Sequence, residues 1–148
     1  MLELCLSHDH ERHIRDHGCR AFPHECCGFL LGRDEAGRRR IDRVLSATND
    51  RGEEEQHNRF TITPEAFMKA DRAAREADLE ILGFYHSHPD APARPSEYDR
   101  EHAWPVYSYV IVSVRDKVDQ ELTSWILADD RSTFHAQPVS IDQIQESV

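Results

Sequence analysis

Two histidines and one aspartate are spaced in the sequence so that all three could bind one metal ion. His86 and His88 are two residues apart at the end of an apolar segment with the composition of a strand. Alternate side chains of a strand share a face, so both imidazoles can point toward the same ion. The proline-rich stretch 89–95 then turns the chain, and Ser96 starts a short helix with Asp99 in its first turn. Two histidines and a carboxylate leave a fourth position for water, as in catalytic rather than structural zinc sites.

Each part of this pattern also has an ordinary structural explanation. The Ser96-x-x-Asp99 spacing is a capping-box pattern, and most such pairs only stabilise the start of a helix. A His-x-His pair can arise by chance at a polar strand end, and the 10 histidines of the chain raise that background. Both patterns together, with proline-set spacing between them, are much less expected by chance and favour a metal site.

Hydrolysis at such a site also needs a general base, and Glu25 is a candidate. It stands in the segment Pro-His-Glu-Cys-Cys-Gly, directly before the first apolar strand. A carboxylate that faces the open metal position could take a proton from a bound water. Spacing alone does not bring Glu25 to the metal, and it competes with many other acidic residues.

The elements that would position these residues follow from the pattern of apolar side chains. We predict helices over 8–21, 64–78 and 96–104, the second with Thr63 as its cap and Pro64 in its first turn. The other expected features are a turn at 34–37, a charged loop over 49–58, and strands over 28–32, 39–48 (with an irregularity), 60–63, 79–86, 107–114, 122–127 and 133–139. This order predicts an α+β fold with a mixed sheet.

Length and charge narrow the class of protein. The 148 residues carry 18 basic and 28 acidic side chains, for a net charge of −10, which disfavours binding to nucleic acid. No apolar run approaches the ~20 residues of a membrane helix, and the acidic first residues do not resemble a signal peptide. The four cysteines form no Cys-x-x-Cys pair, which favours a reducing, cytoplasmic setting. We expect one domain over 1–140 and a tail, helical or disordered, over 141–148.

The candidate site resembles a known signature. His86-x-His88, seven residues, Ser96, two residues and Asp99 match the metal-binding motif of the JAMM (JAB1/MPN/Mov34) metalloprotease family. Glu25, in Glu-x-Cys-Gly before an apolar strand, resembles the catalytic glutamate of that family. Three further segments are similar to its bacterial members: Phe60–Pro64, Gly83–Tyr85 and Tyr109–Val112. The resemblance covers nearly the whole chain.

The resemblance implies a role for each of these residues. His86, His88 and Asp99 would bind Zn²⁺, with water in the fourth position. Glu25 would deprotonate that water and later protonate the leaving amine, and Ser96 would hydrogen-bond the water or the oxyanion. The implied fold is a curved mixed β-sheet flanked by helices, with layering like that of cytidine deaminases, in agreement with the α+β pattern.

The resemblance also implies a class of substrate. Family members hydrolyse amide bonds after the C-terminal Gly-Gly of ubiquitin-like proteins. Short bacterial members act on sulfur-carrier proteins of the ThiS/MoaD kind, by trimming a precursor tail or releasing an amino acid. The acidic loop 51–56 could rim a groove that takes such a tail by strand addition at a sheet edge, although a solvated loop is the simpler interpretation.

The alternative function is a catalytically silent scaffold that binds a ubiquitin-like partner. Such scaffolds lose ligands that this chain keeps. The sequence does not predict an oligomeric state.

Other hydrolase motifs fit the sequence less well. His24-Glu25 begins like the His-Glu-x-x-His helix of zincins, but position 28 is glycine and a strand follows. A zinc nucleobase deaminase would need His-x-Glu with Pro-Cys-x-x-Cys, and the chain has neither. A cysteine protease built on Cys26 or Cys27 lacks a local nucleophile signature, and a packing role is expected beside an apolar strand.

A second group of histidines lies near the N-terminus, at positions 8, 10, 13 and 17. His10, His13 and His17 would share one face of the predicted 8–21 helix. This arrangement leaves open a second metal site or, more simply, a solvated polar face.

Overall fold

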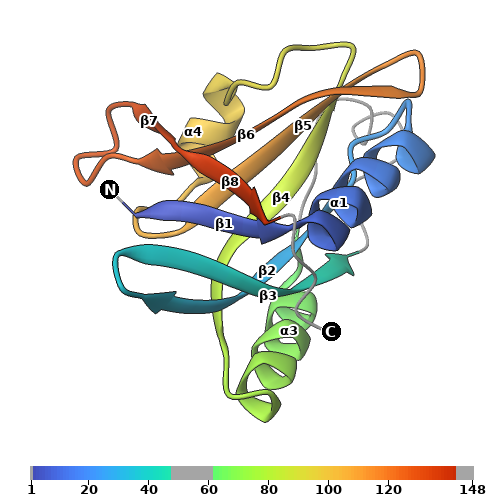
Figure 1. Ribbon diagram of the computed structural model, residues 1–148. Coiled ribbons are helices and arrows are strands. Elements are labelled where there is room, and N and C mark those ends of the chain that lie inside the picture. The colour runs from blue at the N-terminus through green and yellow to red at the C-terminus, as the bar shows by residue number, and fades with distance from the viewer. Residues whose placement is uncertain (1, 48–61, 143–148) are drawn as a thin grey trace.

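The computed structural model describes residues 2–47 and 62–142, which form one strongly curved sheet with helices packed against it (Figure 1). The strands are β1 Glu3–Ser7, β2 Cys27–Glu35, β3 Arg38–Ala47, β4 Glu80–Pro89, β5 Ser108–Arg115, β6 Val118–Leu127, β7 Phe134–Gln137 and β8 Val139–Asp142. The helices in the described ranges are α1 His8–Ala21, α3 Pro64–Glu76 and α4 Glu97–His102. The predicted α+β fold, with a curved mixed sheet flanked by helices, is confirmed.

The strand order is β7-β6-β5-β4-β2-β3-β1-β8, which places β4 near the middle of the sheet. β4 pairs in parallel with β5 and antiparallel with β2, and β1 pairs in parallel with both β3 and β8. The predicted irregularity lies in β3. Leu31 of β2 pairs with Arg43 and Gly32 pairs with Ile41, so Asp42 is the extra residue of a bulge.

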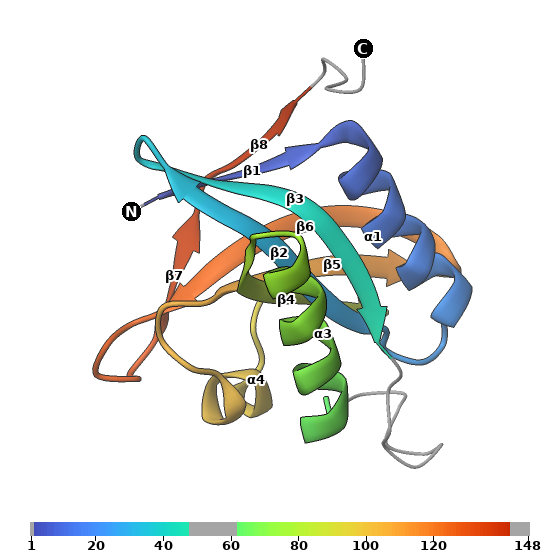
Figure 2. The same cartoon turned by 90° about the horizontal axis from the view of Figure 1, so that it is seen from below.

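The two faces of the sheet carry separate hydrophobic clusters because successive residues of a strand point to opposite sides. On one face, Tyr85 of β4 belongs to a cluster with Ile14 of α1. On the other face, Phe84 of β4 belongs to a cluster with Ala70 and Ala74 of α3. Figure 2 shows α1 and α3 apart from one another, with strands of the sheet between them.

The two outermost strands of the sheet are consecutive in the chain, joined only by Pro138. The sheet therefore curls until its edges meet, and hydrogen bonds fix the seam. The backbone N–H of Leu4 donates to the carbonyl of Pro138 at 2.9 Å, and the side-chain amide of Gln137 donates to the carbonyl of Leu2 at 2.7 Å. This closure removes most of the exposed sheet edge.

Both long helices begin where the sequence predicted, and each begins with a side-chain cap. Helix α1 has the predicted bounds, and its N-cap Ser7 accepts a hydrogen bond from the N–H of His10 at 3.0 Å. Helix α3 begins at Pro64 as predicted, and the hydroxyl of Thr63 accepts from the N–H of Ala66 at 3.1 Å. Each cap satisfies a backbone donor that the first helical turn leaves unpaired.

Several element boundaries differ from the prediction. β1 and β8 were not expected, and residues 141 and 142 of the predicted tail belong to β8. The expected turn at 34–37 is shorter, since β2 continues to Glu35. The expected 96–104 helix ends at His102.

The remaining expectations fall wholly or partly outside the described residues. The charged loop 49–58, the first half of the 60–63 strand and the end of the tail lie there. Ile62 and Thr63, the described half of that strand, are not in a strand. Among the helices that the structure describes, none combines the length and the apolar character needed to cross a bilayer.

Candidate metal centre

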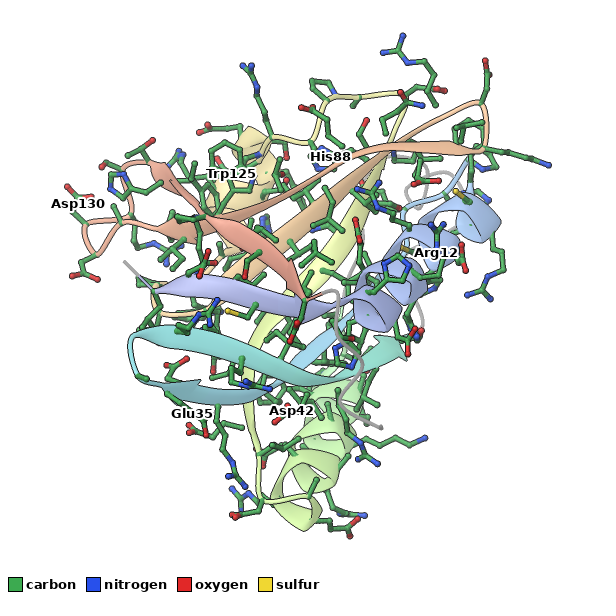
Figure 3. The ribbon with its side chains drawn as sticks, viewed as in Figure 1. Arg12, Glu35, Asp42, His88, Trp125 and Asp130 are labelled. Carbon is green, nitrogen blue, oxygen red and sulfur yellow. The ribbon has the colours of Figure 1, made fainter. Side chains whose placement is uncertain are left out.

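Both histidines of the candidate site lie on β4 and point to the same face of the sheet. The strand extends to Pro89, so His86 and His88 are both within regular pairing, opposite Ile111 and Ser113 of β5. Their exposed fractions are 1% and 7%. Figure 3 marks His88 near the carboxyl-terminal end of this strand. The interior of the sheet therefore holds the backbone of both residues rigidly.

Asp99 reaches the same place from the first turn of α4. The Ser96 hydroxyl accepts a hydrogen bond from the N–H of Asp99 at 3.0 Å, and the N–H of Ser96 donates to Asp99 Oδ2 at 2.9 Å. These two bonds form a complete capping box. The ordinary explanation of Ser-x-x-Asp is thus correct, but the same bonds also fix the direction of the carboxylate.

Three potential ligand atoms converge at this point. The Nε2 atoms of His86 and His88 are 3.1 Å apart, and Asp99 Oδ2 lies 3.3 Å from the first and 3.1 Å from the second. Bonds of about 2.0–2.1 Å in a tetrahedral zinc site place neighbouring ligand atoms about 3.3–3.4 Å apart. The donor set and its spacing therefore fit a metal ion. In residues 2–47 and 62–142, this is the only group of three or more histidine, cysteine or acidic side chains that could hold one.

The proline-rich loop fixes the tautomer of His88. Its Nδ1 lies 2.9 Å from the carbonyl oxygen of Pro92, which can only accept a hydrogen bond. The proton is therefore on Nδ1, and the lone pair of Nε2 faces the other two ligand atoms. The loop itself is anchored to the sheet, because the hydroxyls of Ser113 and Thr123 donate to the carbonyls of Ala91 and Ala93 at 2.6 Å and 2.7 Å.

The electrostatics of the group favour the metal-binding protonation states. Burial opposes ionisation of the Asp99 carboxyl, but the neighbouring His86 and His88 outweigh it and hold the pKa well below its usual range. Burial lowers the pKa of His86, against the opposing effect of Asp99. At neutral pH the site therefore offers a carboxylate and a neutral imidazole of His86, which are the forms that coordinate metals.

Glu25 lies two residues before β2, and the structure brings this part of the chain beside β4. Cys27 pairs with His86, the N–H of Ser87 donates to the carbonyl of Cys26 at 3.2 Å, and the N–H of Cys26 donates to the Ser87 hydroxyl at 2.8 Å. Continuing this antiparallel alternation puts Glu25 across from His88, on the same face of the sheet. Glu25 is 6% exposed and is not part of the three-residue ligand group.

A large groove opens beside the three converging side chains. It has a volume of about 1000 Å³ and is lined by residues of β4, α3 and α4 and of the segment between α4 and β5. Its lining follows β4 from His86 toward Glu80. Its apolar lining includes Phe67, Phe84, Tyr107, Tyr109, Ile111 and Phe134. The groove is thus long and mostly apolar, with the potential metal ligands at one end.

The other chemistry considered for the sequence is not supported. Burial raises the pKa of the Cys26 thiol to about 12, whereas a nucleophilic cysteine needs a depressed pKa. None of the four cysteines, all of which lie in the described residues, forms a disulfide. Cys26 and Cys27 are both buried, as expected for packing residues.

The N-terminal histidines are not simply a solvated face. His17 Nδ1 lies 2.7 Å from the Tyr85 hydroxyl, which donates to the Ser46 hydroxyl at 3.2 Å. His13 Nε2 lies 2.9 Å from the same Ser46 oxygen. Burial is the main cause that lowers the pKa of His17, to about 4. These histidines therefore tie α1 to β3 and β4, on the face of the sheet opposite the candidate site.

Sequence reasoning missed three groups that support the site. The Pro92 carbonyl orients His88, the buried hydroxyl of Ser87 holds the chain next to Glu25, and the buried guanidinium of Arg39 lines the far end of the groove. A backbone carbonyl leaves no signal in a sequence. Ser87 carried a usable signal, because it lies between the two histidines and so must point to the opposite face.

The comparison with known proteins agrees with the fold and with the site. A family model of prokaryotic homologs of the JAB domain matches residues 7–128. The chain is 34% identical to a desampylase of Pyrococcus furiosus over 107 residues, which cover 71% of this chain and 68% of that protein. It is 33% identical to the CysO-cysteine peptidase of Mycobacterium tuberculosis over 126 residues, which cover 84% of this chain and 82% of that one.

Solved structures show the same architecture. A solution structure of a protein from Desulfitobacterium hafniense matches with a TM-score of 0.84 and 27% identity, over 97% of this chain and 96% of that chain. One from Salinibacter ruber matches with a TM-score of 0.71 and 43% identity, over 98% and 93%. With the domain model, the named peptidase relatives and the His-His-Asp group in agreement, the chain belongs to the JAMM metalloprotease family, in its branch of prokaryotic JAB-domain homologs.

Proposed function

We propose that this protein is a zinc-dependent peptidase that hydrolyses the amide bond after the C-terminal Gly-Gly of a ubiquitin-like or sulfur-carrier protein. The observation that carries the proposal is the convergence of His86, His88 and Asp99 within 3.1–3.3 Å at the end of an apolar groove. His86, His88 and Asp99 would be the ligands, in a set of two histidines and one carboxylate that leaves a position for water.

A zinc ion held by His86, His88 and Asp99 would supply Lewis-acid chemistry to the scissile carbonyl and to the attacking water. The chain supplies the proton transfers. Glu25, buried across from His88, takes the proton of the attacking water and returns it to the leaving amine.

Ser96 stabilises the oxyanion that forms on the scissile carbonyl. Its hydroxyl already accepts one hydrogen bond, from the N–H of Asp99, and this leaves its own proton to donate. The capping box orients the hydroxyl before substrate arrives, so little reorganisation is needed at the moment of reaction. The groove orients the extended tail of the substrate along β4, which keeps the scissile bond at the ligand end.

The proposed substrate class rests on the groove and on the named relatives. The relatives include a desampylase, a CysO-cysteine peptidase and a probable TtuB-protein conjugate cleaving protease of Thermus thermophilus, the last 37% identical over 98 residues. Ubiquitin-like proteins end in an extended Gly-Gly tail, and the groove that ends at His86 and Asp99 offers room for such a tail. We place the protein in the cytoplasm, where thiols such as its four cysteines stay reduced. A silent scaffold is disfavoured, since all three ligand residues are in place.

The decisive test uses sulfur-carrier proteins of the source organism, each extended beyond Gly-Gly by a short peptide or by one cysteine. Mass spectrometry after incubation with zinc-loaded protein should show release of everything after Gly-Gly. Prior removal of metal by a chelator should abolish cleavage, and added Zn²⁺ should restore it. A zinc-loaded preparation that cleaves none of these carriers would refute the substrate assignment, and a purified protein that binds no Zn²⁺ would refute the metal.

A further inference from the structure

The segment between α4 and β5, residues 103–107, exposes two large apolar side chains at the rim of the groove. Trp104 is 65% exposed and Val106 is 69% exposed. Both nevertheless line the same groove as His86 and Asp99. Two other exposed large apolar side chains of the described residues, Met68 and Val118, do not line it. The exposure of Trp104 and Val106 is therefore tied to the groove and needs an explanation.

Val106 has a backbone conformation that a β-branched residue rarely adopts. Its φ is +86°, in the left-handed region where the branched Cβ is crowded by the backbone. Such strain persists only where surrounding contacts determine the conformation, and it clusters at sites of binding and catalysis. The strain turns the Val106 side chain outward, although burial would be the usual place for a valine.

Arg39 is the main contact that holds this segment in place. Its guanidinium, 6% exposed, is paired with both carboxylate oxygens of Asp34 at 2.8 Å and 3.0 Å. Its Nη1 donates to the carbonyl of Val106 at 2.7 Å, to the Ser108 hydroxyl at 3.1 Å and to the carbonyl of Leu82 at 3.2 Å. These hydrogen bonds fix the orientation of the buried guanidinium. The guanidinium in turn holds the carbonyl of Val106, the residue with the strained backbone, against β4.

Two further contacts fix Trp104. Its backbone N–H donates to the hydroxyl of Tyr109 at 2.9 Å, and the guanidinium carbon of Arg131 lies 5.7 Å from the centre of its indole ring. The cation–π contact covers one side of the ring and leaves most of it open to solvent. The segment is thus rigid while its apolar side chains are exposed, which is typical of a preformed binding edge.

We propose that Trp104 and Val106 form a docking edge for the folded domain of the ubiquitin-like carrier protein, and that Arg39 is the residue that positions this edge. The inference rests on the proposed function, and the edge is continuous with the groove that would take the tail. Three helical residues and two extended ones place Trp104 within about 12 Å of Asp99. An extended tail of four residues spans about 13 Å. A carrier whose Gly-Gly reaches the ligands would therefore rest its folded domain at this distance.

The charge around the edge specifies the chemistry of the partner. Glu101, Asp129 and Asp130 are exposed near Trp104, and the last lies on the turn marked in Figure 3. Two nearby cations are already engaged. Arg131 contacts the indole ring and donates to the carbonyl of Glu101 at 3.3 Å, and Arg100 pairs with Glu97 and donates to the carbonyl of Arg131 at 3.0 Å. The matching surface on the carrier is an apolar patch bordered by lysine or arginine, which gives both contact area and electrostatic complementarity.

The test measures binding and cleavage separately. Calorimetric titration of the zinc-loaded protein with a sulfur carrier that already ends in Gly-Gly gives Kd without turnover. Trp104→Ala and Val106→Asp should each raise Kd by about tenfold or more. The controls Met68→Ala and Val118→Asp are comparable substitutions of exposed apolar side chains that do not line the groove. They should leave Kd within about twofold of the unmodified protein. In Trp104→Ala and Val106→Asp, cleavage of a synthetic peptide that carries only the tail should fall less than cleavage of the whole carrier, because the peptide has no folded domain to dock. In Met68→Ala and Val118→Asp it should stay within about twofold.

A second pair of variants tests the positioning role. Val106→Gly relieves the positive φ, so the thermal midpoint should stay the same or rise while carrier binding weakens. Arg39→Lys keeps the charge but cannot hold Val106, Leu82 and Asp34 together, and it should raise KM for the carrier more than it lowers kcat. A loss of carrier binding without a loss of thermal stability in Val106→Gly would separate docking from folding.

Unchanged Kd in both Trp104→Ala and Val106→Asp would overturn the docking edge, and so would an equal loss of cleavage for carrier and peptide. Failure of the proposed function looks different. If the unmodified protein binds the carrier and loses that binding in the two variants, but cleaves neither carrier nor peptide, the docking edge stands and the peptidase assignment fails. If the unmodified protein cleaves the peptide but binds no carrier, the docking edge fails and the peptidase assignment stands.

Discussion

Replacing Ser96 separates the capping role that the structure shows for its hydroxyl from the oxyanion role that we propose for it. The oxygen accepts the N–H of Asp99 as a helix cap, and its proton is free to donate to the oxyanion. Ser96→Ala removes both. Loss of an N-cap costs about 1 kcal/mol, which in a domain of this size corresponds to a drop of about 3 °C in Tm. Loss of one oxyanion donor lowers kcat by about 10²–10³-fold.

Zinc affinity should change far less than kcat in Ser96→Ala. The backbone N–H of Ser96 donates to Asp99 Oδ2 at 2.9 Å, and alanine keeps that bond. The Asp99 carboxylate should therefore stay near its position when the hydroxyl is removed. We expect zinc affinity to fall by no more than about tenfold, the smaller end of the effects seen when a residue that supports a metal ligand is replaced. A competitive titration with a zinc-binding dye measures this loss on the same preparation as the kinetics.

Ser96→Asp is the matched variant that distinguishes the two tasks. Aspartate caps helices about as well as serine, so the Tm should return to within about 1 °C of the unmodified protein. A carboxylate has no proton to donate at neutral pH, so kcat should stay as low as in Ser96→Ala. Cleavage of an extended sulfur carrier, followed by mass spectrometry, gives the rates. Full activity in Ser96→Asp would show that Ser96 acts only as a helix cap and would refute its role in oxyanion binding.

Three other replacements test the remaining assignments. Glu25→Gln should retain zinc while hydrolysis falls by at least about 10²-fold, since the base is not a ligand; full activity would remove Glu25 from the mechanism. Asp99→Ala should weaken zinc binding by more than about tenfold in a chelator competition, and unchanged affinity would exclude Asp99 as a ligand. Because the pKa of His17 is lowered from 6.5 to about 4 in the folded protein, the unfolded chain binds more protons between these values, and stability should fall as the pH drops from 6.5 to 4. His17→Gln should flatten that part of a Tm-versus-pH curve, and an unaltered curve would contradict the assignment.

The parts of the fold that sequence reasoning predicted are those with local signals. Thr63 followed by Pro64 marks the start of α3 within two residues, and the capping interaction is present as expected. The strands β1 and β8 depend instead on pairing between the two ends of the chain. Leu4 and Leu6 alternate as in a strand, but five residues of alternation are a weak pattern without a known partner.

The same contrast holds within the site. His86, His88 and Asp99 were predicted because strand alternation and a capping box act over a few residues. Glu25 could not be placed from spacing, because it comes beside His88 only through the pairing of β2 with β4. A buried arginine such as Arg39 is also hard to predict, since arginine is mostly exposed and the four residues that accept its hydrogen bonds come from three separate parts of the chain.

In the proposed mechanism, the alternation along β4 would keep the metal ligands and the general base aligned with one another. His86 and His88 point to the face of the sheet that carries the groove, and Ser87 between them points to the opposite core, where it is fully buried. That buried hydroxyl accepts the N–H of Cys26 and so fixes the backbone one residue after Glu25. Because the strand is rigid, the distance from the base to the ligands depends on packing on the opposite face of the sheet and not on the groove. In the proposed mechanism, substrate would therefore enter and leave the groove without disturbing the alignment of Glu25, which is the preorganisation that proton transfer in a hydrolase requires.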